Sequence, residues 1–359
     1  MRKIFISLII LSILFPTFII INIAKVNKVL GDEKYFENCA KEQIKNFVYK
    51  KFNNINNIKD INYTIEVNNK SNIILLVKVI YTLKLDNIED HPVINAYEKF
   101  LNNDSLKGSL SYSKRKFLEK QLNLWKENII SYINKNQELN IRFKIILDTN
   151  KFYLYIEDPF NNFIEADKYI EIKSYKEIEE ETYKNLIEIN SDPNFKISNT
   201  KYNYNPSLSV NYANTYTSNT SKKVWCSSDP NDWVYQDKNY YNPNYYAYCA
   251  DCANYVSQFI YAGGINTDST WRPYTYAWIN CIGLNDYMWS NYCYLTYYRP
   301  YAIPGSICMM DQNNNGNPDH TTLIVYNDGS ILKYSAHTHD RKQYILPNLS
   351  FQVWFLVFY

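Results

Sequence analysis

Apolar positions in residues 32–200 repeat first with helical and then with strand spacing. Ile44, Phe47 and Val48 fall on one side of a helix predicted over 38–52. The same patterns predict further helices over 112–134 and 170–189, and strands over 61–67, 73–85, 139–147 and 152–157. Helices combined with hairpins favour a small α+β unit.

A short helix and a hairpin are predicted in the last third of the chain. The helix spans 251–264, where Asp251 is a suitable N-cap and Gly263 belongs to a stop signal. The hairpin lies within 321–337 and contains an Asp-Gly pair, which is a strong signal for a two-residue turn between strands.

The N-terminal residues 1–30 have the pattern of a signal peptide or membrane anchor. Arg2 and Lys3 precede an apolar run over 4–24, which is long enough to cross a bilayer. A retained anchor is the favoured interpretation, and a cleaved signal peptide is the alternative. Both place the rest of the chain outside the membrane, so we expect an extracytoplasmic protein, either membrane-anchored or secreted.

Length and composition divide the remainder into two units. A chain of 359 residues predicts about two domains. Lys, Glu, Asn and Ile are frequent in the first part, whereas Tyr, Trp and Cys are enriched after it. We expect an accessory α+β module over 32–195, a linker over 196–205 and a second domain over 206–359. The net charge of +2, without a basic stripe, argues against a nucleic-acid partner.

Cys252 is the best candidate for a catalytic nucleophile. It lies in the first turn of the helix predicted over 251–264, where the helix dipole and free N–H groups favour a thiolate. The same N–H groups could bind the oxyanion of a tetrahedral intermediate. A structural disulfide is the alternative, because the chain has seven cysteines.

Histidines in the predicted hairpin supply the base that such a thiol needs. A two-residue turn places His320 directly opposite His337, with Cβ atoms about 4.5–5.5 Å apart. One imidazole would then hold the other in its tautomer. A bulge would instead bring in His339. His91, before Pro92, is interpreted as a surface residue.

Seven segments of the second domain occur in a characteristic order. They are 210–213, 242–245, 251–258, 262–264, 304–307, 319–325 and 336–341. Together they resemble the putative amidase domain family of bacterial surface proteins, a branch of the NlpC/P60-like, papain-related cysteine hydrolases. The resemblance implies a papain-like (NlpC/P60-type) domain after the α+β module, with 336–341 as its closing strand.

The same resemblance assigns roles to the candidate site residues. It implies Cys252 as nucleophile, His320 as base and a polar third residue at the position of His337. The supporting or alternative site residues are Asp251, Asp319 and His339. The implied reaction is hydrolysis of an amide bond, with peptidoglycan or a surface peptide as the substrate and no cofactor or metal. A non-catalytic cell-wall or surface binding module on the same fold is the alternative.

Two other motifs point to different chemistry. Cys249 and Cys252 form a Cys-x-x-Cys pair, which suggests a thiol oxidoreductase or half of a zinc site. A disulfide between these two cysteines would inactivate the proposed nucleophile. The loop over 311–319 resembles the first half of a calcium loop, but it lacks the acidic ligand at the twelfth position. A polar surface loop is the favoured interpretation.

Overall fold

The computed structural model describes residues 33–69, 71–107, 109–148, 151–192, 202–245 and 249–359. The signal peptide or anchor predicted over 1–30 lies outside these residues, as does most of the linker predicted over 196–205. Within the described residues, no helix combines the length and apolarity that crossing a membrane requires.

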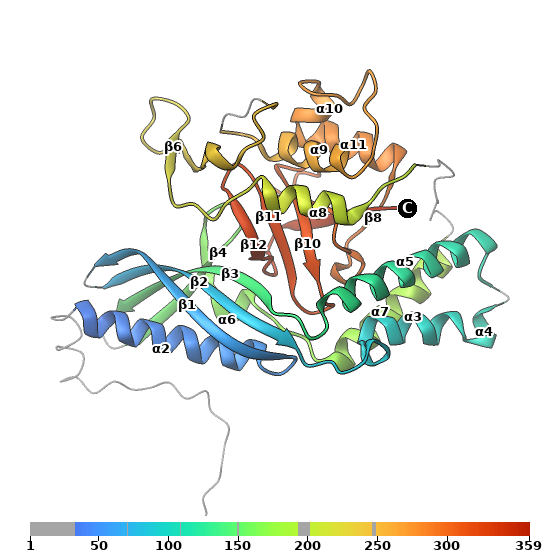
Figure 1. Ribbon diagram of the computed structural model, residues 1–359, viewed down its shortest axis with the longest axis horizontal. Coiled ribbons are helices and arrows are strands. Elements are labelled where there is room, and N and C mark those ends of the chain that lie inside the picture. The colour runs from blue at the N-terminus through green and yellow to red at the C-terminus, as the bar shows by residue number, and fades with distance from the viewer. Residues whose placement is uncertain (1–32, 70, 108, 149–150, 193–201, 246–248) are drawn as a thin grey trace, which may run out of the picture.

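A mixed sheet of eleven strands runs through the molecule (Figure 1). Nine strands follow the order β1-β2-β3-β12-β11-β10-β9-β13-β8, and β4 and β5 branch from β3. The strands are β1 (Asn56–Asn69), β2 (Asn72–Leu83), β3 (Gln137–Asp148), β4 (Lys151–Glu157), β5 (Phe163–Glu165), β8 (Cys293–Thr296), β9 (Ile307–Asp311), β10 (His320–Asn327), β11 (Leu332–Ala336), β12 (Arg341–Ile345) and β13 (Gln352–Phe358). A separate hairpin pairs β6 (Lys223–Trp225) with β7 (Trp233–Tyr235).

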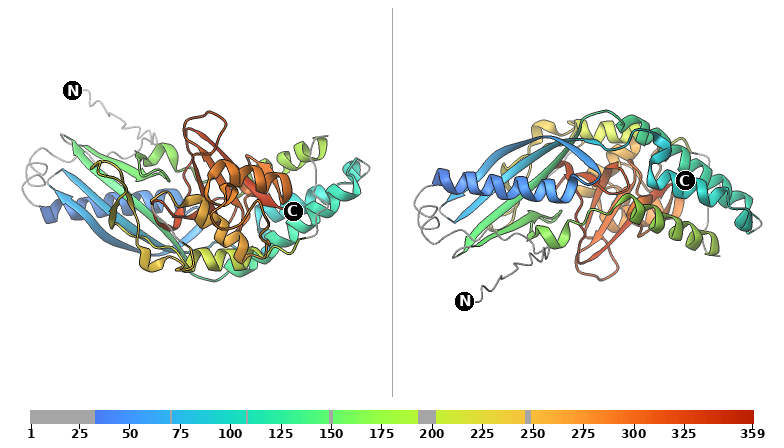
Figure 2. Two further views of the ribbon diagram at one scale, coloured as in Figure 1. Left: turned by 90° about the horizontal axis from the view of Figure 1, so that it is seen from above. Right: turned by 90° about the horizontal axis from the view of Figure 1, so that it is seen from below.

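Helices cover the sheet in three groups, which the two further views in Figure 2 also separate. The first group is α2 (Glu33–Phe52) and α6 (Ala166–Tyr169), on the side of β1 to β4. The second is α3 (Pro92–Leu101), α4 (Asp104–Lys107), α5 (Tyr112–Tyr132) and α7 (Tyr175–Ser191). The third is α8 (Pro206–Thr215), α9 (Cys252–Ala262), α10 (Tyr276–Ile279) and α11 (Cys281–Asn291), above the C-terminal strands in Figure 1.

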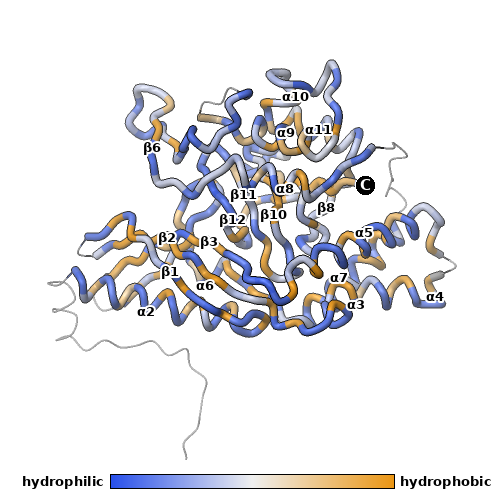
Figure 3. Tube along the Cα trace, in the orientation of Figure 1, coloured by the Kyte–Doolittle hydropathy of each residue, from blue (hydrophilic) through white to orange (hydrophobic). Residues whose placement is uncertain are grey.

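Local sequence explains where several helices begin. Ser174 caps α7 in a capping box with Glu177, and Ser111 caps α5 through the main-chain N–H of Lys114. Apolar and polar residues alternate along α2 and α5, as the changes of colour in Figure 3 show. Each helix therefore buries one face against the sheet or its neighbours and leaves the other polar.

Most predicted elements of the first half are confirmed, with ends that move by a few residues. The helix predicted over 38–52 begins at Glu33, and both predicted hairpins are present. Helix α3 was not predicted. The closing strand expected over 336–341 is wrong, because residues 337–340 form a turn and β12 begins only at Arg341.

The sheet continues across the predicted boundary between the accessory module and the second domain. β3 of the module runs parallel to β12, with Asn140 opposite Tyr344. One hydrophobic core joins residues of both halves, including Trp125 from α5 and Tyr326 from β10. A second core lies between the sheet and helices α9 and α11. The two predicted units therefore share a sheet and a core.

Buried charged side chains also connect the accessory module to β12 of the second domain. Glu157 at the end of β4 accepts hydrogen bonds from Arg142 of β3 and pairs with Arg341 of β12. All three side chains are about 1% exposed. Arg142 is also bound by Glu66 from β1. An ion network of this kind is costly to break, because any unpaired member is a buried charge.

His91 is not a surface residue, contrary to the prediction. Its side chain is 1% exposed, and the centre of its ring lies 5.6 Å from that of Trp125. Its Nε2 lies 3.0 Å from the main-chain oxygen of Asp328, in the turn after β10. Burial lowers the pKa of His91 to about 4, despite that hydrogen bond. A neutral imidazole therefore supports the β10–β11 turn from the accessory module.

Candidate active site

Cys252 is the first residue of α9. Two contacts hold the chain immediately before it, a disulfide and a main-chain hydrogen bond. Cys226, next to β6, forms a disulfide with Cys249, three residues before the helix. The main-chain N–H of Asp251 donates to the hydroxyl of Thr338. The side chain of Asp251 makes no capping bond to the helix. The first-turn N–H groups of α9 are thus not occupied by the carboxylate at the N-cap.

The thiol of Cys252 meets His320 at the start of β10 and Cys281 at the start of α11. Its sulfur lies 3.4 Å from that of Cys281. The hydrogen bond from Cys281 lowers the pKa of Cys252 most; burial opposes it, and the charge and hydrogen bond of His320 add to the lowering. The net pKa lies well below that of an ordinary thiol. The pKa of Cys281 is raised, because it shares this bond with Cys252 and is buried.

His320 is enclosed, and a residue of the accessory module forms part of the enclosure. The ring of Phe160, in the turn after β4, lies 5.4 Å from the imidazole of His320 and 5.3 Å from Phe351. Among the described residues, Nε2 of His320 has no hydrogen-bond partner. Nδ1 is therefore the ring nitrogen left to face Cys252, and apolar packing restrains the imidazole.

The register predicted for the β10–β11 hairpin is wrong. The turn is two residues longer than predicted, with Asn327 opposite Leu332, and an irregularity between Ile324 and Tyr326 then shifts the pairing back by one, so that Leu323 lies opposite Ser335. Continuing this register places His337 opposite Thr321 rather than opposite His320. Since side chains alternate between the two faces of a sheet, a shift of one residue moves His337 to the other face.

His337 is instead part of a buried ion pair at the start of α9. Its Nδ1 lies 2.6 Å from the carboxylate of Asp251, and its Nε2 lies 2.6 Å from the main-chain oxygen of Tyr216. Tyr241 and Tyr255 stack on its two faces, with ring centres 3.9 and 3.8 Å away. The predicted contact between His337 and His320 is therefore wrong: both nitrogens of His337 have other partners.

This environment fixes the charge of His337. Burial by itself lowers the pKa, but the hydrogen bond to Asp251 and the charges of Asp340 and Asp251 outweigh it. The resulting pKa is above that of an ordinary histidine. His337 is the cation that holds Asp251, and hence the start of α9, in place.

His339 belongs to the turn of residues 337–340, which joins β11 to β12. Its Nδ1 accepts a hydrogen bond from the main-chain N–H of Tyr235. Burial, followed by the charges of Arg341, His320 and Arg142, lowers the pKa of His339 to about 3. His339 is therefore a neutral neighbour of His320.

Asp319 stabilises the loop that leads into β10. Its carboxylate accepts bonds from the main-chain N–H groups of Gln312 and Asn313. Its main-chain oxygen lies 3.8 Å from the sulfur of Cys281. Asp311 likewise binds N–H groups of its own loop. Among the described residues, no group of three or more His, Cys, Asp or Glu is arranged to hold a metal ion.

The disulfide between Cys226 and Cys249 removes one alternative reading of the Cys-x-x-Cys pair. Cys249 is bonded to Cys226 and is unavailable to Cys252. Cys252 and Cys281 are both free thiols. A Cys249–Cys252 disulfide and an oxidoreductase that uses this pair are therefore not supported by the structure.

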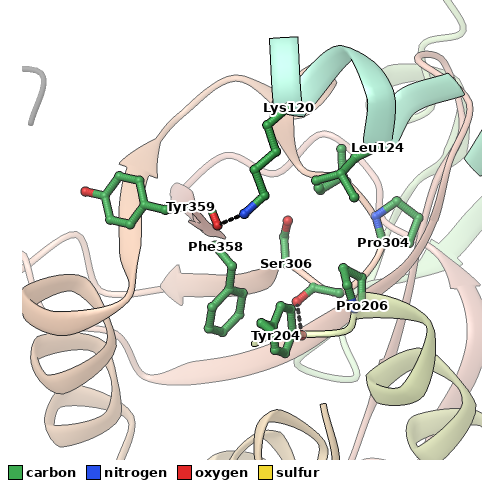
Figure 4. Close-up of a pocket in the computed structure, with 10 residues that line it drawn as sticks. Lys120, Leu124, Tyr204, Pro206, Pro304, Ser306, Phe358 and Tyr359 are labelled. Atoms are coloured by element: carbon green, nitrogen blue, oxygen red, sulfur yellow. Dashed lines mark hydrogen bonds between the residues drawn. The ribbon is translucent and has the colours of Figure 1, made fainter. Parts of the chain in front are cut away.

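Two cavities lie away from Cys252. One of about 30 Å³ lies between α5 and the last strand, beside Lys120, Ser306 and Phe358 (Figure 4). It has room for only a few water molecules. A larger one of about 260 Å³ is lined by α5 and α8, including Asn128 and Asn211. Neither contains a residue of the Cys252–His320 pair.

The residues of this site lie within a segment that is similar to a known family. Residues 203–354 match the putative amidase domain. The chain is also similar to the uncharacterized protein YhbB of Bacillus subtilis (strain 168), with 27% identity over 116 residues. That similarity covers 28% of this chain and only 37% of YhbB. No solved structure matches the chain.

The putative amidase domain contains both Cys252 and His320, and the match supports amide hydrolysis as the reaction class. The papain-like fold and the NlpC/P60 assignment stay predictions. Phe160 lies outside the matched residues, in the accessory module. A residue outside the matched segment therefore contacts the candidate base His320.

Sequence reasoning missed Phe160 and the role of Cys281. A signal for Cys281 was present, since Asn280 is a favourable N-cap, and its side chain does accept from the N–H groups of Ile282 and Gly283. Cys281 thus has the same first-turn position as Cys252. Nothing local indicates Phe160, because its contact spans 160 positions of the chain.

The ion pair of His337 predicts a pH dependence of stability. Its raised folded-state pKa contributes stability that is complete below the unfolded pKa of about 6.5 and is lost as pH rises through the folded pKa. Asp251→Asn removes the partner and should flatten this dependence. Urea unfolding between pH 6 and 9 measures it. Parallel pH profiles for wild type and Asp251→Asn would contradict the assignment.

Proposed function

We propose that the protein is a cysteine-type amide hydrolase with Cys252 as nucleophile and His320 as base. The observation that carries the proposal is the position of the Cys252 thiol, at a helix start and in a hydrogen bond with His320. A lowered thiol pKa at such a position is typical of reactive cysteines. The match to the putative amidase domain supports the reaction class.

The proposed reaction has two stages. The thiolate of Cys252 attacks the carbonyl carbon, and first-turn N–H groups of α9 stabilise the oxyanion. Protonated His320 then gives its proton to the leaving amine. In the second stage His320 removes a proton from water, which attacks the thioester and releases the acid. Phe160 keeps the imidazole of His320 in position during both stages.

Peptide bonds of peptidoglycan are the proposed substrate, and the proposed location is outside the cytoplasm. The apolar run over 4–24 after Arg2 and Lys3 supports export, with this run as a membrane anchor or cleaved signal. The disulfide between Cys226 and Cys249 also fits an oxidising compartment. A surface peptide is the alternative substrate.

The test is a digestion of purified peptidoglycan by the intact protein. We expect new amino groups and a matching set of carboxyl groups, identified by mass spectrometry of the released fragments. Fragments that retain every peptide bond, despite an active Cys252 thiol, would contradict peptidoglycan as the substrate. New reducing sugar ends would indicate a different bond.

A binding module is the second candidate function. The observation that favours it is enclosure: Cys252 is 9% exposed and His320 is 5% exposed. A substrate carbonyl must still reach the sulfur. Rapid alkylation of Cys252 by a small reagent supports the enzyme, whereas an inert thiol together with peptidoglycan binding supports the module.

A further inference from the structure

The contact between the thiols of Cys252 and Cys281 allows a reaction other than the proposed hydrolysis. Each thiol belongs to the first residue of a helix, α9 or α11. The two sulfur atoms are 3.4 Å apart and both cysteines are free. A disulfide needs about 2.05 Å, so side-chain motion of roughly 1.4 Å would join them. Each is 9% exposed, so a small oxidant has a narrow approach.

We propose that Cys252 and Cys281 form a redox modification site, in which a hydroperoxide oxidises Cys252 and Cys281 then captures it as a disulfide. The inference rests on the proposed function only in treating Cys252 as a reactive thiolate. The disulfide blocks the nucleophile reversibly and protects it from further oxidation. Cys281 is the resolving thiol of this pair.

The two steps balance as follows. The Cys252 thiolate attacks the outer oxygen of the hydroperoxide, the O–O bond breaks, and an alcohol or water leaves after protonation. The product is the sulfenic acid of Cys252. The sulfur of Cys281 then attacks that sulfur, the S–O bond breaks, and hydroxide leaves as water with the thiol proton of Cys281. Two thiols lose two electrons in total, and the peroxide gains them.

The surroundings favour the order in which the two thiols react. Before oxidation, the bond and charge of Cys252 help to raise the pKa of Cys281, so Cys281 stays protonated. Oxidation removes the negative charge from Cys252. That change weakens the main cause of the raised pKa and makes the thiolate of Cys281 easier to form. The other two buried thiols, Cys293 and Cys308, are less well placed, since burial raises the pKa of both.

The experiment treats the intact protein with hydrogen peroxide and maps cysteines under non-reducing conditions. Before oxidation, Cys252 is alkylated with iodoacetamide at pH 6 to measure its reactivity. Three proteins are compared: wild type, Cys281→Ser and Cys293→Ser. The hydroxyl of Cys281→Ser still donates to Cys252 but cannot form a disulfide. Cys293→Ser changes another buried thiol of the same core and controls for packing.

We expect a Cys252–Cys281 peptide in wild type and Cys293→Ser, with alkylation of Cys252 lost and then restored by dithiothreitol. In Cys281→Ser, peroxide should convert Cys252 to sulfinic and sulfonic acids, which dithiothreitol does not reverse. Rapid alkylation of Cys252 with equal irreversible oxidation in wild type and Cys281→Ser would overturn this inference alone. Slow alkylation of Cys252 before oxidation would instead contradict the reactive thiolate, and with it both the proposed function and this inference.

Discussion

Cys252→Ala is expected to lower kcat for amide hydrolysis by roughly 10⁶-fold, the effect of removing the nucleophile from a catalytic unit whose members act together. Cys281 is a poor replacement for the attacking sulfur, because burial and the charge of Asp319 still raise the pKa of its thiol when Cys252 is absent. The measurement is release of amino groups from peptidoglycan fragments at saturating concentration.

Cys293→Ala is the matched control for this substitution. Cys293 is a fully buried free thiol in the same hydrophobic core, at the start of β8. Its loss should cost about 1 kcal/mol of stability and leave kcat within a few-fold of wild type. Equal losses of activity in the two variants would mean that a thiol in this core serves packing rather than catalysis.

Glu157→Gln is expected to destabilise the protein by about 3–5 kcal/mol, because it leaves a buried guanidinium without its counter-charge. In this variant Arg341 loses its carboxylate partner Glu157. Arg142 also loses its ion pair with residue 157 and keeps the one with Glu66. The glutamine preserves the volume and some hydrogen bonds of the carboxylate, so the change isolates the charge. Urea unfolding at pH 7 measures the difference in free energy.

An exposed ion pair provides the control for Glu157. Glu180 pairs with Lys176 on α7, and both side chains are largely exposed. Glu180→Gln should therefore change stability by about 0.5 kcal/mol or less. A cost below 1 kcal/mol for Glu157→Gln would contradict the view that this network holds the accessory module to β12.

Local patterns predicted the elements of the first half well because they depend on neighbouring residues. The helical spacing of Ile44, Phe47 and Val48 and the two hairpins needed no knowledge of distant contacts. The helix at Cys252 was equally local, since Asp251 and Gly263 mark its ends. Position at a helix start was therefore enough to nominate Cys252.

Long-range features could not be derived in the same way. The hairpin register depended on a bulge in β10 between Ile324 and Tyr326 as well as on turn length, and the net shift of one residue moved His337 to the other face. The parallel pairing of β3 with β12 joins segments about 200 positions apart, and no local pattern signals it. The same holds for Phe160, which reaches His320 only because the two halves share a sheet.

These contacts change the view of the accessory module. It supplies Phe160 to the enclosure of His320, Glu157 to the buried ion network and His91 to the β10–β11 turn. Phe160 contacts His320 directly, whereas the other two act on β12 and on the turn at the end of β10 opposite to His320. The module is thus part of the framework of the site, and its substitutions should alter the reactivity of Cys252 as well as stability.

The most direct test of the account is the rate at which iodoacetamide alkylates Cys252 at pH 6, in wild type, His320→Ala and His339→Ala. An ordinary thiol with a pKa near 8.5 is less than about 1% ionised at this pH. We predict rapid alkylation in wild type and His339→Ala, and a rate at least about tenfold lower in His320→Ala. An unchanged rate in His320→Ala, or slow alkylation of wild type, would contradict the Cys252–His320 pair.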